Sequence, residues 1–171
     1  MSEKTIFETP QVDAALAHMA EAMATPEIWM IGIRRGGSQV ADRLQALLEA
    51  AGSAVHRGDL DISFYRDDLD TIGPNPEVRP SRLPFDMNER TLWLVDDVLY
   101  TGRTIRAALG EIFDYGRPAG IRLAVLVDRG GRQLPIAADV TGLSHAAPEG
   151  CSVKLDYDDG DWRIVEKRVT P

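Results

Sequence analysis

The order of apolar and polar positions along the chain predicts strands that alternate with helices. Three nearly continuous apolar runs, 28–33 (IWMIGI), 91–95 (TLWLV) and 121–127 (IRLAVLV), are typical of strands buried on both faces of a parallel sheet. Residues 59–65 (DLDISFY) alternate between polar and apolar side chains and predict one further strand. These segments are expected to share one sheet.

Helical spacing separates the predicted strands. Thr9 is suited to cap a first helix and Pro10 to occupy its first turn. Apolar residues then repeat at helical spacing at Val12, Leu16, Met19 and Met23, and again at Val40, Leu44, Leu47, Leu48 and Ala51. A third helix is predicted over 104–115, and Gly116 and Pro118 end it. The chain is therefore predicted to be an α/β domain with a mainly parallel, twisted sheet flanked by helices, whose ligands bind at the carboxyl ends of the strands.

Two segments depart from this alternation. CSVKLDY (151–157) and WRIVEKRV (162–169) flank a short Gly-containing turn and predict a C-terminal β-hairpin. Residues 67–88 are rich in proline, carry Arg79 and Arg82, and show no periodicity. A loop of this length inside a compact domain is more often a functional flap than a simple connection, so we expect a flexible flap over 67–88. A disordered insertion is the alternative.

Composition narrows the class of protein. A length of 171 residues with 44% hydrophobic residues suits one domain that spans 1–171. The net charge of −8 does not favour binding of nucleic acid or an anionic membrane by the whole surface, although a local basic patch stays open. A single cysteine, Cys151, and the lack of a signal peptide or of an apolar run of about 18 residues lead us to expect a cytoplasmic protein without membrane contact.

The stretch LWLVDDVLYTGRT (92–104) carries the strongest chemical signal. Asp96 and Asp97 follow a buried strand, at the edge where open α/β sheets bind ligands. Residues 100–104 then lead into a helix, whose unpaired amides and dipole favour a phosphate. A phosphate loop beside two carboxylates suits a ribose 5-phosphate, because the carboxylates accept hydrogen bonds from vicinal hydroxyls. Alternatively, the two acids only turn the chain and cap the helix.

The complete pattern of apolar residues, two acids and Tyr-Thr-Gly-x-Thr resembles the motif by which type I phosphoribosyltransferases bind phosphoribosyl pyrophosphate. In order and spacing, the segments DISFYRDDL, LPFD, VDDVLYTGRTIRAAL, GRP and LAVLVDRGGRQLPIAAD resemble the pyrimidine operon attenuator and uracil phosphoribosyltransferase family, PyrR. This resemblance implies an α/β core with a small hood over the base.

The resemblance also implies roles for individual residues. Asp96 and Asp97 match the acids that bind the ribose. The other matched positions are Tyr100, Thr101, Gly102, Arg103 and Thr104 for the 5-phosphate, Arg34, Arg35, Gly36 and Gly37 for the pyrophosphate, Tyr65, Arg66 and Asp67 at the root of the flap, Arg79 and Arg82 on the flap, and Asp128 and Arg129 for the base. Of these, Asp96, Asp97, Arg34, Arg35 and Arg66 are the expected catalytic residues.

Phosphoribosyl transfer passes through a ribose with oxocarbenium character, so carboxylates near the ring stabilise the developing positive charge. The expected cofactor is Mg²⁺, carried by the substrate and reached through water from Asp96 or Asp97, with no direct protein ligand. The scattered histidines, His18, His56 and His145, are interpreted as structural or surface residues.

Some positions depart from the family's pattern. The usual Thr-Arg-Gly of the pyrophosphate loop is Arg35-Gly36-Gly37 here, which displaces the charge by one position. Tyr100 stands where purine-specific relatives commonly have an aspartate, and this favours a pyrimidine base. Basic positions of the RNA-binding members are Ala14, Ala15, Ala17, Gly131, Ala137 and Leu143 here, with Arg132 retained. RNA binding is therefore expected to be weakened.

The favoured function is a uracil phosphoribosyltransferase that converts uracil and phosphoribosyl pyrophosphate to UMP and pyrophosphate. Two alternatives stay open. The chain is either a regulator that senses UMP or UTP and binds pyr mRNA, or a catalytically weak subunit that binds nucleotide and regulates a protein partner. A homo-oligomer, dimeric or larger, is expected in each case.

Overall fold

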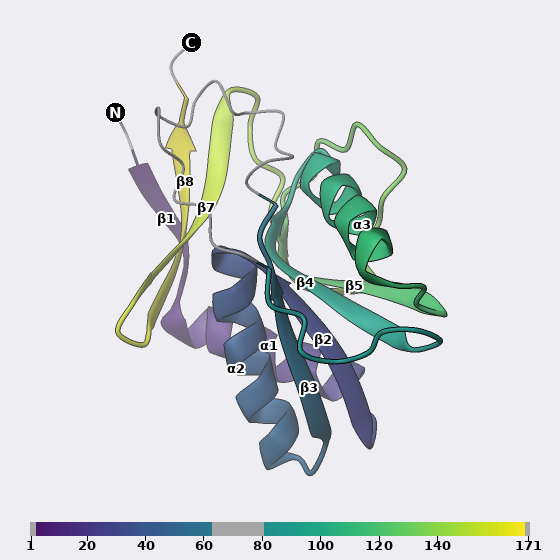
Figure 1. Ribbon diagram of the computed structural model, residues 1–171. Helices are drawn as coiled ribbons and strands as arrows, with labels where there is room; N and C mark the ends of the chain where they lie inside the picture. The colour runs from purple at the N-terminus through teal and green to yellow at the C-terminus, as the bar shows by residue number, and fades with distance from the viewer. Residues whose placement is uncertain (1–2, 63–80, 170–171) are drawn as a thin grey trace.

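A computed structural model describes residues 3–62 and 81–169 (Figure 1). Its elements are β1 (Glu3–Glu8), α1 (Thr9–Met23), β2 (Glu27–Ile33), α2 (Gly36–Ala50), β3 (Ala54–Leu60), β4 (Thr91–Leu99), α3 (Arg103–Tyr115), β5 (Gly120–Asp128), β6 (Val140–Ser144), β7 (Cys151–Asp158) and β8 (Asp161–Arg168). In this part of the chain, a parallel sheet has the strand order β3-β2-β4-β5-β6. A smaller antiparallel sheet has the order β1-β8-β7 and is called the hood below.

The side chains of the central strands alternate between two apolar layers. In β4, Trp93 and Val95 pack in a cluster with α1 and α2, whereas Leu92 and Leu94 pack in a second cluster with α3. Figure 1 accordingly shows α1 and α2 on one face of the sheet and α3 on the other. The continuous apolar runs of β4 and β5 thus reflect burial on both faces, as expected for a parallel sheet flanked by helices.

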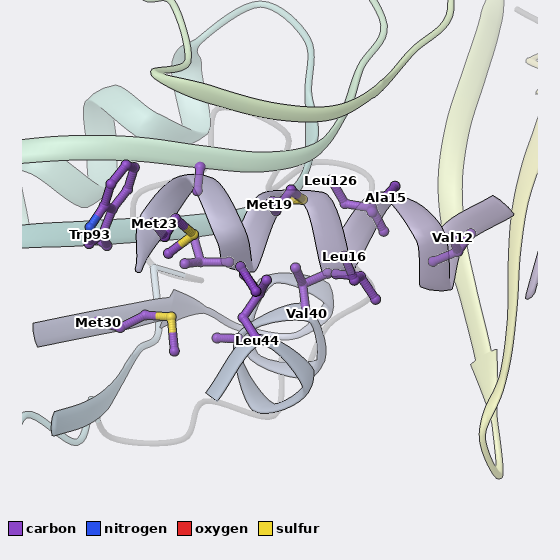
Figure 2. Packing of buried hydrophobic residues seen from close by; sticks show 14 of the residues in the cluster. Val12, Ala15, Leu16, Met19, Met23, Met30, Val40, Leu44, Trp93 and Leu126 are labelled. Carbon is purple, nitrogen blue, oxygen red and sulfur yellow. The ribbon is translucent and has the colours of Figure 1, made fainter. Parts of the chain in front are cut away.

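The larger cluster joins both helices of one face to the sheet. Figure 2 shows Leu16 and Met23 of α1 beside Val40 and Leu44 of α2, with Trp93 of β4 at the edge of the cluster. The first four of these side chains are no more than 1% exposed. Burying each such side chain stabilises the fold by about 1.5 to 3 kcal/mol, so this layer is a rigid support for the loops at the strand ends.

The predicted helices are confirmed, but the predicted cap of the first helix is wrong. Glu8 is the N-cap of α1, and it exchanges hydrogen bonds with Gln11 in a capping box. The hydroxyl of Thr9 instead donates to the carbonyl of Trp162 at 3.2 Å and accepts from its amide at 2.9 Å. Thr9 therefore ties the start of α1 to the hood.

The strand predicted at 59–65 is misplaced, because β3 covers Ala54–Leu60 and residues 63–65 lie outside the described part. β3 is an edge strand that pairs only with β2 among the described strands. Its side chains are less buried than those of β4, so its sequence lacks an apolar run. The pattern missed β1 and β6 for the same reason, because both are edge strands of their sheets.

The predicted C-terminal hairpin is confirmed as β7 and β8, and β1 adds a third strand to it. Its turn places Asp159 at φ 44° and Gly160 at φ 95°, and positive φ at both central residues is what a two-residue type I′ hairpin turn requires. Two side-chain contacts hold the hood against the end of the parallel sheet: Arg129 donates to the carbonyl of Cys151 at 2.9 Å, and His145 meets Glu166 at 2.7 Å.

None of the helices within residues 3–62 and 81–169 combines the length and the apolar character needed to span a membrane.

Candidate active site

A cavity of about 1570 Å³ opens at the carboxyl ends of β2 and β4 and is bounded on one side by the hood strand β7. Its lining includes Arg34, Arg35 and Gly36 after β2, Asp96 and Asp97 in β4, Tyr100, Thr101, Gly102, Arg103 and Thr104, and Arg129. The fold therefore brings three predicted groups together: the pyrophosphate loop, the two acids and the phosphate loop, residues 100–104.

Asp96 and Asp97 lie within β4, near its carboxyl end, rather than after the strand. Asp96 is 5% exposed, and its Oδ1 accepts a hydrogen bond from the amide of Asp97 at 2.9 Å. The Oδ1 of Asp97 accepts one from the amide of Val98, also at 2.9 Å. These short backbone contacts fix the orientation of both carboxylates at the cavity wall.

Gly36 and Gly37 allow the pyrophosphate loop to lie directly on the acids. A Cβ atom at position 36 would overlap the carboxylate of Asp97, and one at position 37 would come within 2.5 Å of the Val95 carbonyl oxygen. The family's usual Thr-Arg-Gly, which would place an arginine at position 36, therefore does not fit here. In this loop conformation an arginine at position 36 has no room, and Arg35 carries the charge.

The phosphate loop contains the left-handed residue Gly102, at φ +93°, which is the N-cap of α3. Gly102 offers no side-chain cap to this helix, so the amides of its first turn are suited to an anion. The hydroxyl of Thr101 accepts from the amide of Arg103 at 3.2 Å and stabilises the turn. The predicted phosphate site therefore has the local geometry that such a site needs.

Of the two residues predicted to bind the base, Asp128 and Arg129, only Arg129 lines the cavity. Arg129 lines the cavity, is 7% exposed, and places its guanidinium carbon 3.6 Å from the centre of the Tyr100 ring. Asp128 does not line it, because its carboxylate accepts from Arg132 at 2.6 Å and from the amide of Gly130 at 2.9 Å. Although burial raises the pKa of Asp128, these hydrogen bonds and the charge of Arg132 hold that pKa below its ordinary value.

The structure does not bring every predicted residue to the cavity. Tyr65, Arg66, Asp67 and Arg79 lie outside the described residues. Arg82 is described but does not line the cavity, and its backbone exchanges two hydrogen bonds of 2.8 Å with that of Asp59.

Sequence reasoning missed several residues of the cavity wall. Asp61 lines the cavity just after β3 and could have been found from the rule that ligands bind at the carboxyl ends of strands. The hood residues 150–155 also line it, but they come from a separate sheet, and no local pattern indicates that contact.

The histidines lie away from the cavity lining. His56 meets Glu27 at 2.8 Å and stacks on Trp29, His145 pairs with Glu166, and His18 is exposed on α1. In the described ranges, no three His, Cys, Asp or Glu side chains form a group that could hold a metal ion.

Comparison with known proteins places this geometry in a family. A phosphoribosyl transferase domain matches residues 2–156. A protein of Roseiflexus sp. (strain RS-1) named bifunctional protein PyrR is 49% identical over 148 residues, covering 83% of this chain and 81% of the relative. The PyrR protein of Deinococcus radiodurans is 46% identical over 164 residues, covering 91% and 90%.

The chain belongs to the PyrR family of phosphoribosyltransferases. The family expected from the motifs is thus confirmed. Among solved structures, the hypoxanthine phosphoribosyltransferase of Trypanosoma cruzi is similar with a TM-score of 0.68 at 18% identity, covering 94% of this chain and 95% of that one. A hypoxanthine-guanine phosphoribosyltransferase of Bacillus anthracis has a TM-score of 0.66 at 16% identity, with 86% of each chain covered. These two likenesses confirm the type I phosphoribosyltransferase fold.

Proposed function

We propose that this chain is a uracil phosphoribosyltransferase, which forms UMP and pyrophosphate from uracil and phosphoribosyl pyrophosphate. The observation that carries the proposal is that the two acids of β4, the phosphate loop and the pyrophosphate loop all line one cavity, with Gly36 directly against Asp97. A ribose held there would have its phosphate at one end, its leaving group at the other and its hydroxyls on the carboxylates.

In this mechanism Asp96 and Asp97 accept hydrogen bonds from the ribose hydroxyls. Their negative charge also stabilises the positive charge that develops on the ring as the bond to pyrophosphate breaks. Both carboxylates are already oriented by backbone amides, so they need little rearrangement during the reaction. The amides of residues 100–104 and the hydroxyls of Thr101 and Thr104 hold the 5-phosphate.

Arg34 and Arg35 face the same cavity and would neutralise the departing pyrophosphate. A magnesium ion fits this donor set, because carboxylate oxygens beside a phosphorylated substrate are ligands that Mg²⁺ prefers, often through water. When bound with the substrate, Mg²⁺ supplies further charge neutralisation at the pyrophosphate oxygens. Asp96 and Asp97 would hold it through water.

We assign the base to the wall formed by Tyr100 and Arg129. Their stacked side chains present an aromatic ring and a cation at the cavity, next to the hood. This wall suits a small planar ring with carbonyl acceptors, such as uracil. Asp128 contributes indirectly, through its contacts with Arg132 and Gly130.

The remaining assignments concern the segment between β3 and β4 and the state of the protein. We propose that residues 67–88 act as a flap of a single domain, 1–171, that Tyr65, Arg66 and Asp67 lie at its root, and that Arg79 and Arg82 close on the pyrophosphate. We also propose a cytoplasmic homo-oligomer.

A second function is favoured by the name of the relatives, bifunctional protein PyrR. It is regulation of pyrimidine genes through pyr mRNA, with UMP or UTP sensed in the same cavity. Arg132, the basic position retained from the RNA-binding members, pairs with Asp128, and the neighbouring Arg129 is buried. We therefore propose catalysis as the main function and weak RNA binding.

The test is an assay of nucleotide formation with radiolabelled uracil, hypoxanthine, guanine and orotate in the presence of phosphoribosyl pyrophosphate and Mg²⁺. We expect label from uracil to enter a nucleotide and the other three bases to react much more slowly. Preferential use of hypoxanthine or guanine would contradict the assignment of the base wall, and reaction of none of the bases would contradict the proposed activity.

A further inference from the structure

The segment that follows β5, residues 129–136, lies against the back of the phosphate loop and is called the bracing segment below. The amides of Gln133 and Leu134 both donate to the carbonyl of Thr101, at 3.0 and 3.1 Å. Arg103 donates to the side chain of Gln133 at 3.1 Å. A Cβ atom on Gly102 would lie 3.2 Å from Ile136, so the two segments are in close contact.

Arg132 links this segment to the loop through three different nitrogen atoms. Its Nη1 donates to the carbonyl of Tyr100 at 2.6 Å, its Nη2 pairs with Asp128 at 2.6 Å, and its Nε donates to the carbonyl of Ile136 at 2.9 Å. Arg132 itself does not line the cavity. The guanidinium thus joins the end of β5, the bracing segment and the first residue of the phosphate loop.

We propose that Arg132, oriented by Asp128, is a positioning residue that holds the phosphate loop in the conformation that binds the 5-phosphate. This role rests on the proposed function and deepens it. It also gives a structural reason for an arginine that resemblance alone would assign to RNA contacts. Its charge is already paired with Asp128, and its donors are directed at protein carbonyls.

The role depends on the shape of the guanidinium and not only on its charge. Its planar fork reaches three acceptors in fixed directions, whereas the ammonium of lysine is a compact point charge. Lysine at position 132 would keep the positive charge near the phosphate but lose this geometry. Arg132→Lys therefore separates positioning from simple electrostatic attraction.

The experiment measures the binding of ribose 5-phosphate and of magnesium pyrophosphate by calorimetry to the wild-type chain and to Arg132→Lys, Arg132→Gln and Arg163→Gln. The control Arg163 also pairs with an aspartate, Asp156 at 2.7 Å, but on the exposed face of the hood. We expect the Kd of ribose 5-phosphate to rise at least about tenfold in both Arg132 variants, because a small displacement of binding groups is costly. The Kd of magnesium pyrophosphate should stay at its wild-type value in both Arg132 variants, and Arg163→Gln should bind both ligands as the wild-type chain does.

Native affinity of Arg132→Lys for ribose 5-phosphate would overturn the positioning role, as would an equal loss for both ligands, which indicates general disruption. Amide hydrogen exchange provides a second readout, with faster exchange expected around residues 100–106 and at the amides of Gln133 and Leu134, which donate to Thr101, and unchanged exchange in the hood. If these results hold while none of the bases reacts, the proposed function fails and the positioning role stands. If uracil reacts and Arg132→Lys binds ribose 5-phosphate normally, the proposed function stands and the positioning role fails.

Discussion

At the scale of single residues, the close contact between Gly36 and Asp97 is the most sensitive feature of the site. We predict that Gly36→Ala displaces either the pyrophosphate loop or the carboxylate, because the added Cβ would overlap Asp97. Turnover with uracil should fall by about a hundredfold, the scale expected for misplaced reacting groups. The measurement is steady-state kinetics with phosphoribosyl pyrophosphate as the varied substrate.

Gly110→Ala is the matched control for this substitution. Gly110 lies in α3, and a Cβ atom there meets nothing within 4 Å. Alanine should leave turnover unchanged and stabilise the helix by about 1 kcal/mol, seen as a raised Tm. Wild-type kinetics of Gly36→Ala would mean that the loop is free to move away from the acids, contrary to the structure.

At the scale of elements, Glu111 links α3 by a hydrogen bond to Ser81, which lies in the segment between β3 and β4. The hydroxyl of Ser81 donates to Oε1 of Glu111 at 2.5 Å and accepts from the amide of Asp61 at 3.0 Å. Burial raises the pKa of Glu111; the Ser81 hydrogen bond opposes this, and the charges of Asp61 and Asp114 add to it, with a raised pKa as the net result.

This raised pKa predicts a pH-dependent contribution to stability. Between the ordinary pKa of Glu111 and its raised value, the folded state binds more protons than the unfolded state, so the free energy of unfolding falls as pH rises through this window. Glu111→Gln keeps an acceptor for Ser81 but cannot ionise. Its stability relative to wild type should therefore increase from about pH 4.5 toward neutrality, measured by urea unfolding at several pH values. A difference that does not change with pH would contradict this account.

The elements that could be predicted from the sequence are those that the core buries most. β4 and β5 are buried on both faces and appear as apolar runs, whereas the edge strands β1, β3 and β6 do not. The same distinction applies to the site. The acids and the phosphate loop form one local motif, so the sequence predicted them. Arg132 contacts Tyr100, 32 positions away in the chain, so no local pattern indicates that contact. Asp61 was missed because the end of β3 was misplaced, although its position just after a strand could have indicated it.

At the scale of the whole molecule, charge governs the prediction for RNA. The net charge of −8 repels a phosphate backbone at long range, and both Arg129 and Arg132 are engaged within the protein. Each phosphate contact that is lost removes about 0.7 to 0.9 from the slope of log affinity against log salt. We predict no specific binding to the organism's own pyr leader tighter than the micromolar range, with or without UMP.

Filter binding at about 0.1 M salt measures this affinity directly. A nanomolar Kd that depends on UMP would contradict this prediction and favour regulation through RNA as the main function. Assembly of several subunits into one basic surface is a route to such a result, so the titration should be accompanied by a measurement of the oligomeric state at the same concentration.

The measurement that tests the central claim most directly is phosphorus NMR of the chain with phosphoribosyl pyrophosphate, Mg²⁺ and uracil, beside the same reaction with the Asp96→Asn, Asp97→Asn double variant. We predict that the wild-type chain forms UMP and pyrophosphate in equal amounts. The double variant should be at least about a hundredfold slower, the scale of losing one preorganised electrostatic group. Ribose 5-phosphate in place of UMP, or near-native turnover by the double variant, would contradict the account.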